Sequence, residues 1–169
     1  DGAMLWPDEQ GGRRVEKGVA IITMSSNLAF NISQQRRGLP IAYMTSLGNA
    51  LKFNLQDAIR TFAQQESVTA IGLYIEGISD PSAFDTAVNC ARELGKPIVA
   101  IKAGRSEVAR KVAMSHAATL AGSDDLVSAL FERTGVARVD SLEALIETLK
   151  VLHVTGPLPN RRIGAMSTS

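Results

Sequence analysis

The chain of 169 residues carries 18 Lys and Arg against 17 Asp and Glu, which gives a formal net charge of +1 at pH 7. Charges of both signs are interspersed, so no field steers the chain onto nucleic acid or an anionic membrane, and we expect neither as a partner. With 45% hydrophobic residues and a single cysteine, the composition excludes a disordered chain and a disulfide framework and is typical of a soluble, cytoplasmic domain.

Short apolar runs alternate with longer amphipathic stretches along the chain, which is typical of strands separated by helices. The first run, residues 18–23, ends at Ser25-Ser26-Asn27, and each of these residue types is a good N-cap for the helix expected over residues 28–37. Further strands are predicted at residues 41–46, 70–75, 98–102 and 136–139. Further helices are predicted at residues 55–65, 81–94, 106–114, 124–134 and 141–152.

Strands that are apolar on both faces and separated by helices favour a parallel sheet that is covered on both sides. We therefore predict an α/β fold, a flavodoxin-like doubly wound parallel sheet of five strands with helices on both faces. Ligands of such a sheet bind beyond the carboxyl ends of its strands. The loops after the first, third and fourth strands are expected to meet there.

We expect both ends of the sequence to belong to neighbouring domains. Residues 1–17 show no periodicity and include a linker-like Gly-Gly pair, so they are predicted to lead in from a preceding domain. Residues 18–155 form the expected domain. Residues 156–169 begin with a Gly-Pro linker and continue with a short apolar stretch, which predicts the first strand of a following domain.

The familiar nucleotide, hydrolase and metal motifs are absent from the sequence. It contains no GxGxxG after the first strand, no GxxxxGK[ST] and no GxSxG segment. The two histidines, His116 and His153, are far apart, and no cysteine or carboxylate lies at metal-ligand spacing, so no metal site is predicted. We expect His153 to be structural and Cys90 to be a small buried residue on a helix.

His116 lies in a run of small residues between two predicted helices, where a side chain can swing without leaving a large cavity. Imidazole is a covalent nucleophile and is largely unprotonated near neutral pH, so His116 is a candidate phosphoryl carrier. A phosphorylated ring needs an acceptor for its other N–H, and Glu76 at the end of the third strand is suitable. The alternatives are a solvated or capping histidine and an ordinary loop carboxylate.

Phosphate oxygens need hydrogen-bond donors, and Ser25-Ser26-Asn27 offers hydroxyls, backbone N–H groups and the positive end of a helix. Lys102 and Arg105, after the fourth strand, could neutralise phosphate. The serines would equally cap their helix without phosphate, and the cations would equally be solvated. The shared placement at one edge of the predicted sheet favours the functional interpretation.

Several segments occur in an order found in nucleoside-diphosphate-forming acyl-CoA synthetases. They are residues 18–27, Arg36-Arg37-Gly38-Leu39-Pro40, Ser46-Leu47-Gly48-Asn49, Leu73-Tyr74-Ile75-Glu76-Gly77-Ile78, residues 96–106 and residues 115–123. The chain therefore resembles this family, which includes ADP-forming acetyl-CoA synthetase and the succinyl-CoA synthetase alpha subunit. The resemblance covers roughly residues 1–169. It implies a second, flavodoxin-like domain that follows a CoA-binding domain and precedes further domains, among them an ATP-grasp unit.

The resemblance implies that His116 ferries a phosphoryl group between an acyl site and a nucleotide site, while Glu76 steadies its ring. The residues implied to bind phosphate are Thr23, Ser25, Ser26 and Asn27. Gly48 and Asn49 are implied on the substrate or CoA side. The implied ligands are CoA, ATP or ADP, Mg²⁺, phosphate and a small carboxylic acid.

The implied partners are the CoA-binding and ATP-grasp domains of the same protein or complex, and a homo-oligomer stays open. The isolated domain is expected to be inactive, because the CoA and nucleotide sites lie mainly on other domains.

Several residues depart from the pattern of the family. Ser26 stands where glycine is usual, Met24 where glutamine or arginine is usual, and Ala117-Ala118 follows His116 in place of Thr-Gly. The ring that would be phosphorylated remains, and small neighbours still permit it to swing. The departures also suit a second interpretation, in which the chain is a non-catalytic, ligase-like sensing domain of a protein acetyltransferase.

Overall fold

The computed structural model describes residues 12–48, 53–104 and 124–158, together with residues 160, 164 and 166. The strands are β1 (Gly18–Thr23), β2 (Ile41–Ser46), β3 (Val68–Ile75), β4 (Ile98–Lys102) and β5 (Ala137–Arg138). The helices are α1 (Ser26–Ser33), α2 (Leu55–Ala63), α3 (Pro81–Glu93), α5 (Asp124–Thr134) and α6 (Leu142–Thr155). The helix predicted over residues 106–114 lies outside the described residues. None of the helices in the described ranges is long and apolar enough to cross a membrane.

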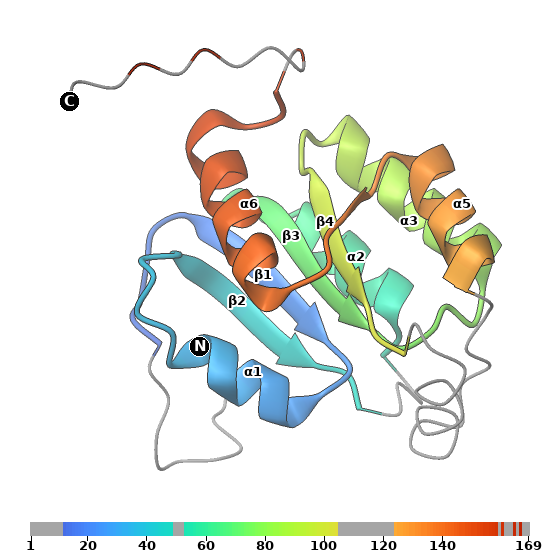
Figure 1. Ribbon diagram of the computed structural model, residues 1–169, viewed down its shortest axis with the longest axis horizontal. Coiled ribbons are helices and arrows are strands. Elements are labelled where there is room, and N and C mark those ends of the chain that lie inside the picture. Colours follow the sequence, from blue (N-terminus) through green and yellow to red (C-terminus); the bar gives the residue numbers. More distant parts are fainter. Residues whose placement is uncertain are drawn as a thin grey trace.

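The five strands form one parallel sheet in the order β2-β1-β3-β4-β5 (Figure 1). Thr23, at the end of β1, lies opposite Ser46 of β2 on one side and Tyr74 of β3 on the other. Ile75 of β3 lies opposite Lys102 of β4. The carboxyl ends of β1, β3 and β4 are therefore neighbours, and the predicted α/β, flavodoxin-like sheet is confirmed.

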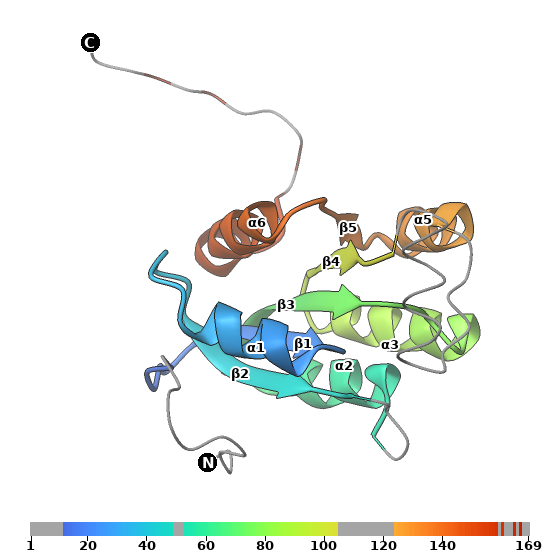
Figure 2. The ribbon, with the colours of Figure 1, turned by 60° about the horizontal axis from the view of Figure 1, so that its bottom comes forward.

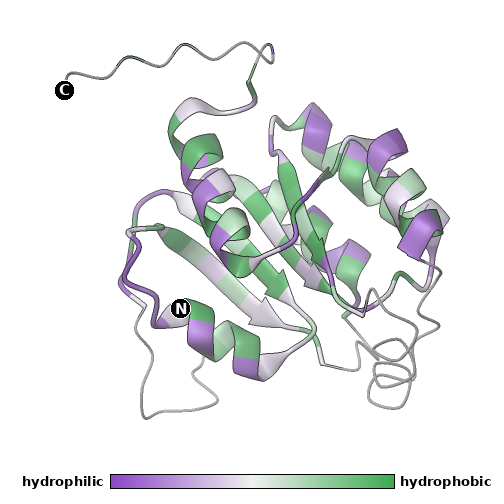
Figure 3. Ribbon diagram, viewed as in Figure 1, coloured by the Kyte–Doolittle hydropathy of each residue, from purple (hydrophilic) through white to green (hydrophobic). Residues whose placement is uncertain are grey.

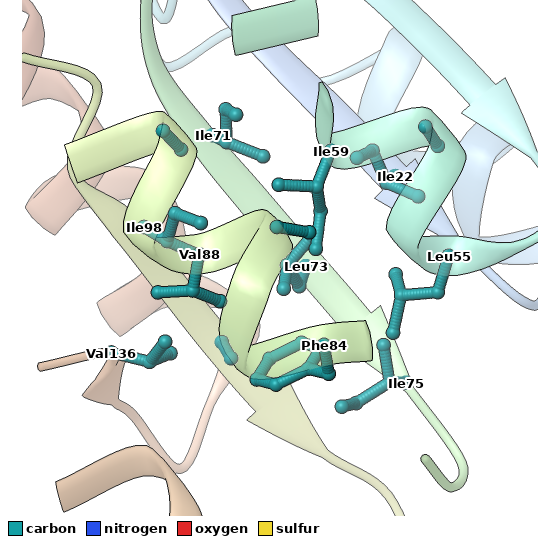
Figure 4. Close-up of a cluster of buried hydrophobic side chains, with 14 of the residues drawn as sticks. Ile22, Leu55, Ile59, Ile71, Leu73, Ile75, Phe84, Val88, Ile98 and Val136 are labelled. Atoms are coloured by element: carbon teal, nitrogen blue, oxygen red, sulfur yellow. The ribbon is translucent and has the colours of Figure 1, made fainter. Parts of the chain in front are cut away.

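Helices cover both faces of the sheet, with α1 and α6 on one face and α2, α3 and α5 on the other (Figure 2). Figure 4 shows the core on the second face, where Ile59 of α2 and Phe84 of α3 lie above Ile71 and Leu73 of β3. Hydrophobic residues follow the central strands, and the hydrophilic ones gather on the outer sides of the helices (Figure 3). Burial of the two apolar layers is the main stabilising contribution.

Four helices have other limits than predicted. α2 ends at Ala63 rather than at residue 65, and α3 ends at Glu93 rather than at residue 94. α1 ends at Ser33 rather than at residue 37, because Gln35 makes local bonds instead of helical ones: its side-chain oxygen accepts from the Arg37 N–H at 2.6 Å. α6 continues to Thr155 rather than residue 152 and ends at Gly156, whose φ of 67° is readily adopted by glycine.

Two strands also differ from the prediction. β3 starts at Val68 rather than residue 70, because Val68 pairs with Gly18 across the sheet. β5 spans only Ala137–Arg138, at the sheet edge. In both strands the length is set by pairing with a neighbouring strand.

Candidate functional site

The turn after β1 is held by the side chain of Thr23, which is fully buried. Its hydroxyl accepts a hydrogen bond from the Ser25 N–H at 2.9 Å and donates one to the Ser25 carbonyl at 3.1 Å. Ser25 is in turn the N-cap of α1, with its hydroxyl oxygen accepting from the Leu28 N–H at 3.4 Å. The helix therefore begins directly at the carboxyl edge of the sheet, with its positive end turned toward that edge.

Ser26 and Asn27 are the exposed first residues of α1, and no acidic residue lies in the first turn of this helix. The hydroxyl of Ser26 lies 3.1 Å from that of Ser46 at the end of β2. The backbone N–H of Leu47 donates to the Thr23 carbonyl at 2.8 Å. These contacts connect residues 23–27, the serine turn, to the end of β2. Because no acidic side chain in the first turn neutralises the positive end of α1, this helix start suits an anion.

Glu76 follows β3 and is half-buried beside this turn. Its backbone N–H donates to the sulfur of Met24 at 3.3 Å, and the Met24 N–H donates to the Tyr74 carbonyl at 3.1 Å. The structure therefore brings Glu76 and the serine turn together. Gly48, the other described residue of the implied substrate-side loop, follows β2 in the left-handed region with a φ of 52° and is exposed.

Lys102 ends β4, and its side chain is buried, with 2% exposed. Its ammonium donates to the Ala103 carbonyl at 2.6 Å. The Ala103 N–H donates to the Ile75 carbonyl at 2.8 Å, which fixes the end of β4 beside the end of β3. The positive charge of Lys102 is thus held against the backbone of Ala103 instead of lying on an open surface.

His116 and Asn49 lie outside the described residues, as do Arg105 and Ser106. The described chain leaves the carboxyl edge at Gly104 and resumes at Asp124, the first residue of α5. There, Asp124 accepts a hydrogen bond from the Arg138 guanidinium of β5 at 2.7 Å. The segment that carries His116 is therefore attached through β4 and α5.

The two residues expected to be structural lie away from this edge. Nδ1 of His153, on α6, lies 2.8 Å from the hydroxyl of Thr69, which also donates to the Gly18 carbonyl at 3.1 Å. This network joins α6 to the amino ends of β1 and β3, as a structural histidine would. Cys90 of α3 is only partly buried, because it lies outside the buried face of that helix, so its predicted burial was overestimated.

A cavity of the described structure lies away from the carboxyl edge. This cavity of about 210 Å³ is lined by residues of the opposite edge, among them Val88, Arg92, Pro97 and Ile98. Ile98 begins β4, so this cavity lies far from the serine turn along the strand. Within the described residues, no group of three His, Cys, Asp or Glu could hold a metal ion.

Tyr74 is a residue of this edge that reasoning from the sequence missed. It lies two positions before Glu76 near the end of β3 and is partly buried against the core beneath α1 and α6. Burial, and then the negative charge of Glu76, raise the pKa of the Tyr74 phenol above its usual value of 10.0. The alternation of side chains along a strand, which puts positions 74 and 76 on one face, was the available signal.

The family model described as "Succinyl-CoA ligase like flavodoxin domain" matches residues 16–152. The chain is 30% identical over 154 residues to the acetate–CoA ligase [ADP-forming] of Methanocaldococcus jannaschii, which covers 90% of this chain and 22% of that protein. It is 36% identical over 114 residues to the subunit alpha of acetate–CoA ligase [ADP-forming] I of Pyrococcus furiosus, covering 66% of this chain and 24% of that subunit. The chain thus spans about a quarter or less of the length of these relatives.

A solved structure with a similar fold is acetyl-coenzyme A synthetase 1 of Ca. Korarchaeum cryptofilum, described as dinucleotide forming and in complex with phosphate and ADP. The TM-score is 0.75 at 26% identity, and the match covers 83% of this chain and 31% of that chain. The match to the family model extends over most of the sequence, from before β1 into α6. The chain belongs to the family of succinyl-CoA ligase like flavodoxin domains.

Proposed function

We propose that this chain is the phosphohistidine domain of an ADP-forming acid–CoA ligase, which interconverts a carboxylic acid, ATP and CoA with acyl-CoA, ADP and phosphate. The observation that carries the proposal is the contact between the serine turn and the start of the loop at Glu76, in a chain of this family. A helix start that could bind phosphate and the backbone of a residue whose carboxylate could orient an imidazole are thereby neighbours.

In the proposed reaction, a ring nitrogen of His116 attacks the phosphorus of an acyl phosphate. The P–N bond forms as the P–O bond to the acyl group breaks, and the carboxylate leaves with the electron pair. An oxygen of ADP then attacks the same phosphorus, the P–N bond breaks, and ATP and free imidazole result. Glu76 accepts a hydrogen bond from the N–H of the other ring nitrogen and stabilises the positive charge of the phosphorylated ring.

The serine turn would hold the phosphoryl oxygens while the bonds change. Backbone N–H groups at the start of α1 and the hydroxyls of Ser25 and Ser26 donate to those oxygens, and the helix end stabilises their charge. Thr23 would contribute indirectly, because its hydroxyl fixes the backbone of Ser25. Asn27, exposed in the first turn, completes the proposed phosphate-binding residues.

The remaining parts of the reaction would lie on other domains. The relatives are several times longer than this chain, and we propose that CoA-binding and ATP-grasp domains of the same protein or complex hold CoA, the nucleotide and Mg²⁺. Residues 18–155 would be the phosphohistidine domain, with residues 1–17 leading in and residues 156–169 leading out. We further propose a cytoplasmic enzyme acting on a small carboxylic acid, with Gly48 and Asn49 on its substrate or CoA side, and no turnover by this domain alone.

The test is transfer of label to His116. The full-length protein that contains this chain is incubated with γ-labelled ATP and Mg²⁺, and label that is acid-labile and base-stable is expected. His116→Ala should abolish it. His153→Ala is the matched control, because His153 is the one other histidine of the sequence and should leave the label in place. Label that survives His116→Ala contradicts the proposal.

The alternative is a non-catalytic sensing domain of a protein acetyltransferase, which Ala117-Ala118 beside His116 favours. Such a domain would bind ligands without turnover. Release of ADP that requires both the acid and CoA, measured on the full-length protein, would contradict this alternative. The absence of such release, together with absence of label on His116, would support it.

A further inference from the structure

The side chain of Tyr74 lies on the same face of the sheet as α1 and α6. It packs against the core cluster of that face, which also contacts Leu28 in the first turn of α1 and Leu142 at the start of α6. Both helices begin at the carboxyl edge, because α1 follows the end of β1 and α6 follows the end of β5. Tyr74 therefore lies near the helix ends that carry the positive dipole.

The backbone of Tyr74 is fixed directly behind the serine turn. Tyr74 lies opposite Thr23 in the parallel pairing of β1 and β3, and its carbonyl accepts from the Met24 N–H at 3.1 Å. Two residues further on, the Glu76 N–H reaches the Met24 sulfur at 3.3 Å. The backbone of Tyr74 is thus fixed between the serine turn and Glu76, and the phenol is close enough to Glu76 to be affected by its negative charge.

The phenolic oxygen of Tyr74 has no hydrogen-bond partner among residues 12–48, 53–104 and 124–158. The other tyrosine of the chain differs: the hydroxyl of Tyr43 donates to the Gln65 side chain at 3.5 Å, and its ring lies against Phe62 with centroids 5.3 Å apart. Tyr74 keeps its proton at neutral pH, so it is a neutral donor at an edge where a carboxylate can only accept.

We propose that the phenolic O–H of Tyr74 donates a hydrogen bond to a phosphoryl oxygen held between the start of α1 and Glu76. The inference rests on the proposed function and adds a donor to it. The N–H groups and hydroxyls of the serine turn approach the phosphoryl group from the β1 side, and Tyr74 approaches from the β3 side. Donors from two strands fix the orientation of the group, which one helix start alone does not.

Direct binding tests the contact without any need for turnover. The chain is labelled with ¹³Cζ-tyrosine and titrated with inorganic phosphate at constant ionic strength. Because the sequence has two tyrosines, Tyr43→Phe assigns the signals. The Tyr74 signal is expected to shift in a saturable way and the Tyr43 signal to stay in place. An unmoved Tyr74 signal, or an equal shift with acetate in place of phosphate, overturns the proposal.

Kinetics of the full-length ligase give the second test, with Tyr74→Phe keeping the ring and removing the donor. In the direction that consumes acyl-CoA, ADP and phosphate, the KM for phosphate should rise about tenfold, as for a lost hydrogen bond to a charged group. The KM for ADP should be unchanged. Tyr43→Phe is the matched control and should leave every constant at the wild-type value. An unchanged phosphate KM in Tyr74→Phe overturns the inference.

The outcomes separate this inference from the proposed function. Label on His116 combined with a Tyr74→Phe variant that binds phosphate normally contradicts the role of Tyr74 alone. If the Tyr74 signal responds to phosphate but His116 takes no label, the proposed phosphohistidine is contradicted and the role of Tyr74 in phosphate binding is not.

Discussion

Thr23→Val is expected to loosen the serine turn while keeping the packing of β1. The Thr23 side chain is fully buried, and its hydroxyl is bonded to both the N–H and the carbonyl of Ser25, at 2.9 and 3.1 Å. Valine keeps the branched shape but leaves both Ser25 groups without this partner. Ser25 is half-buried, so water recovers part of the loss, and we expect a cost of about 1.5 kcal/mol.

For a chain of 169 residues, this cost corresponds to a decrease in Tm of about 3–6 °C. Thr23→Ser is the matched control, because it keeps the hydroxyl and removes one buried methyl group, which costs about 1 kcal/mol. The two variants therefore lose similar stability, and amide hydrogen exchange distinguishes them. The Ser25 N–H should exchange faster in Thr23→Val and at the wild-type rate in Thr23→Ser. Wild-type protection of Ser25 in Thr23→Val would refute the reasoning.

Three further changes have defined outcomes. Gly18→Ala should lower the free energy of unfolding in urea more than Gly72→Ala. The new Cβ at position 18 would lie 2.5 Å from a backbone oxygen, whereas the atoms nearest to a Cβ at position 72 are movable ends of side chains. Equal losses of stability in the two variants would contradict this. In Tyr43→Phe, ultraviolet absorbance should show Tyr74 titrating above pH 10.0. The contribution of the protonated phenol to the stability of the fold should be lost as pH rises through this raised pKa. Titration of Tyr74 at or below pH 10.0 would contradict the burial. Asn54→Ala should cost about 1 kcal/mol and Asn54→Asp little, because the Asn54 side chain caps α2.

The fold was predictable because its signals are local and repeated. The apolar runs of β1, β2 and β4 coincide with the observed strands, since a strand buried on both faces is a continuous apolar run with turn residues at its ends. Asp80 before Pro81, and Ser141, occur at the N-caps of α3 and α6. The predicted limits failed where tertiary pairing decides, as at Val68, which joins β3 through its contact with β1.

The candidate site was predictable in part. The positions of the serine turn and Glu76 follow from sheet topology, because parallel strands end at one edge. Tyr74 was missed because an aromatic residue in an apolar run is ordinarily a core residue. What distinguishes it is a hydroxyl near the strand end that has no partner among the residues the structure describes. The burial of Lys102 was not predicted either, because a lysine at the end of a strand is ordinarily exposed to solvent.

The two halves of the proposed site are attached to the sheet in different ways. The serine turn and Glu76 are linked to each other through Met24, with bonds of 3.1 and 3.3 Å to the end of β3. The segment with His116 instead leaves from β4 and returns at Asp124, where Arg138 of β5 holds the start of α5. The serine turn, which we propose to bind phosphate, keeps its geometry from β1 and β3, as a site that the proposed carrier histidine enters and leaves would require.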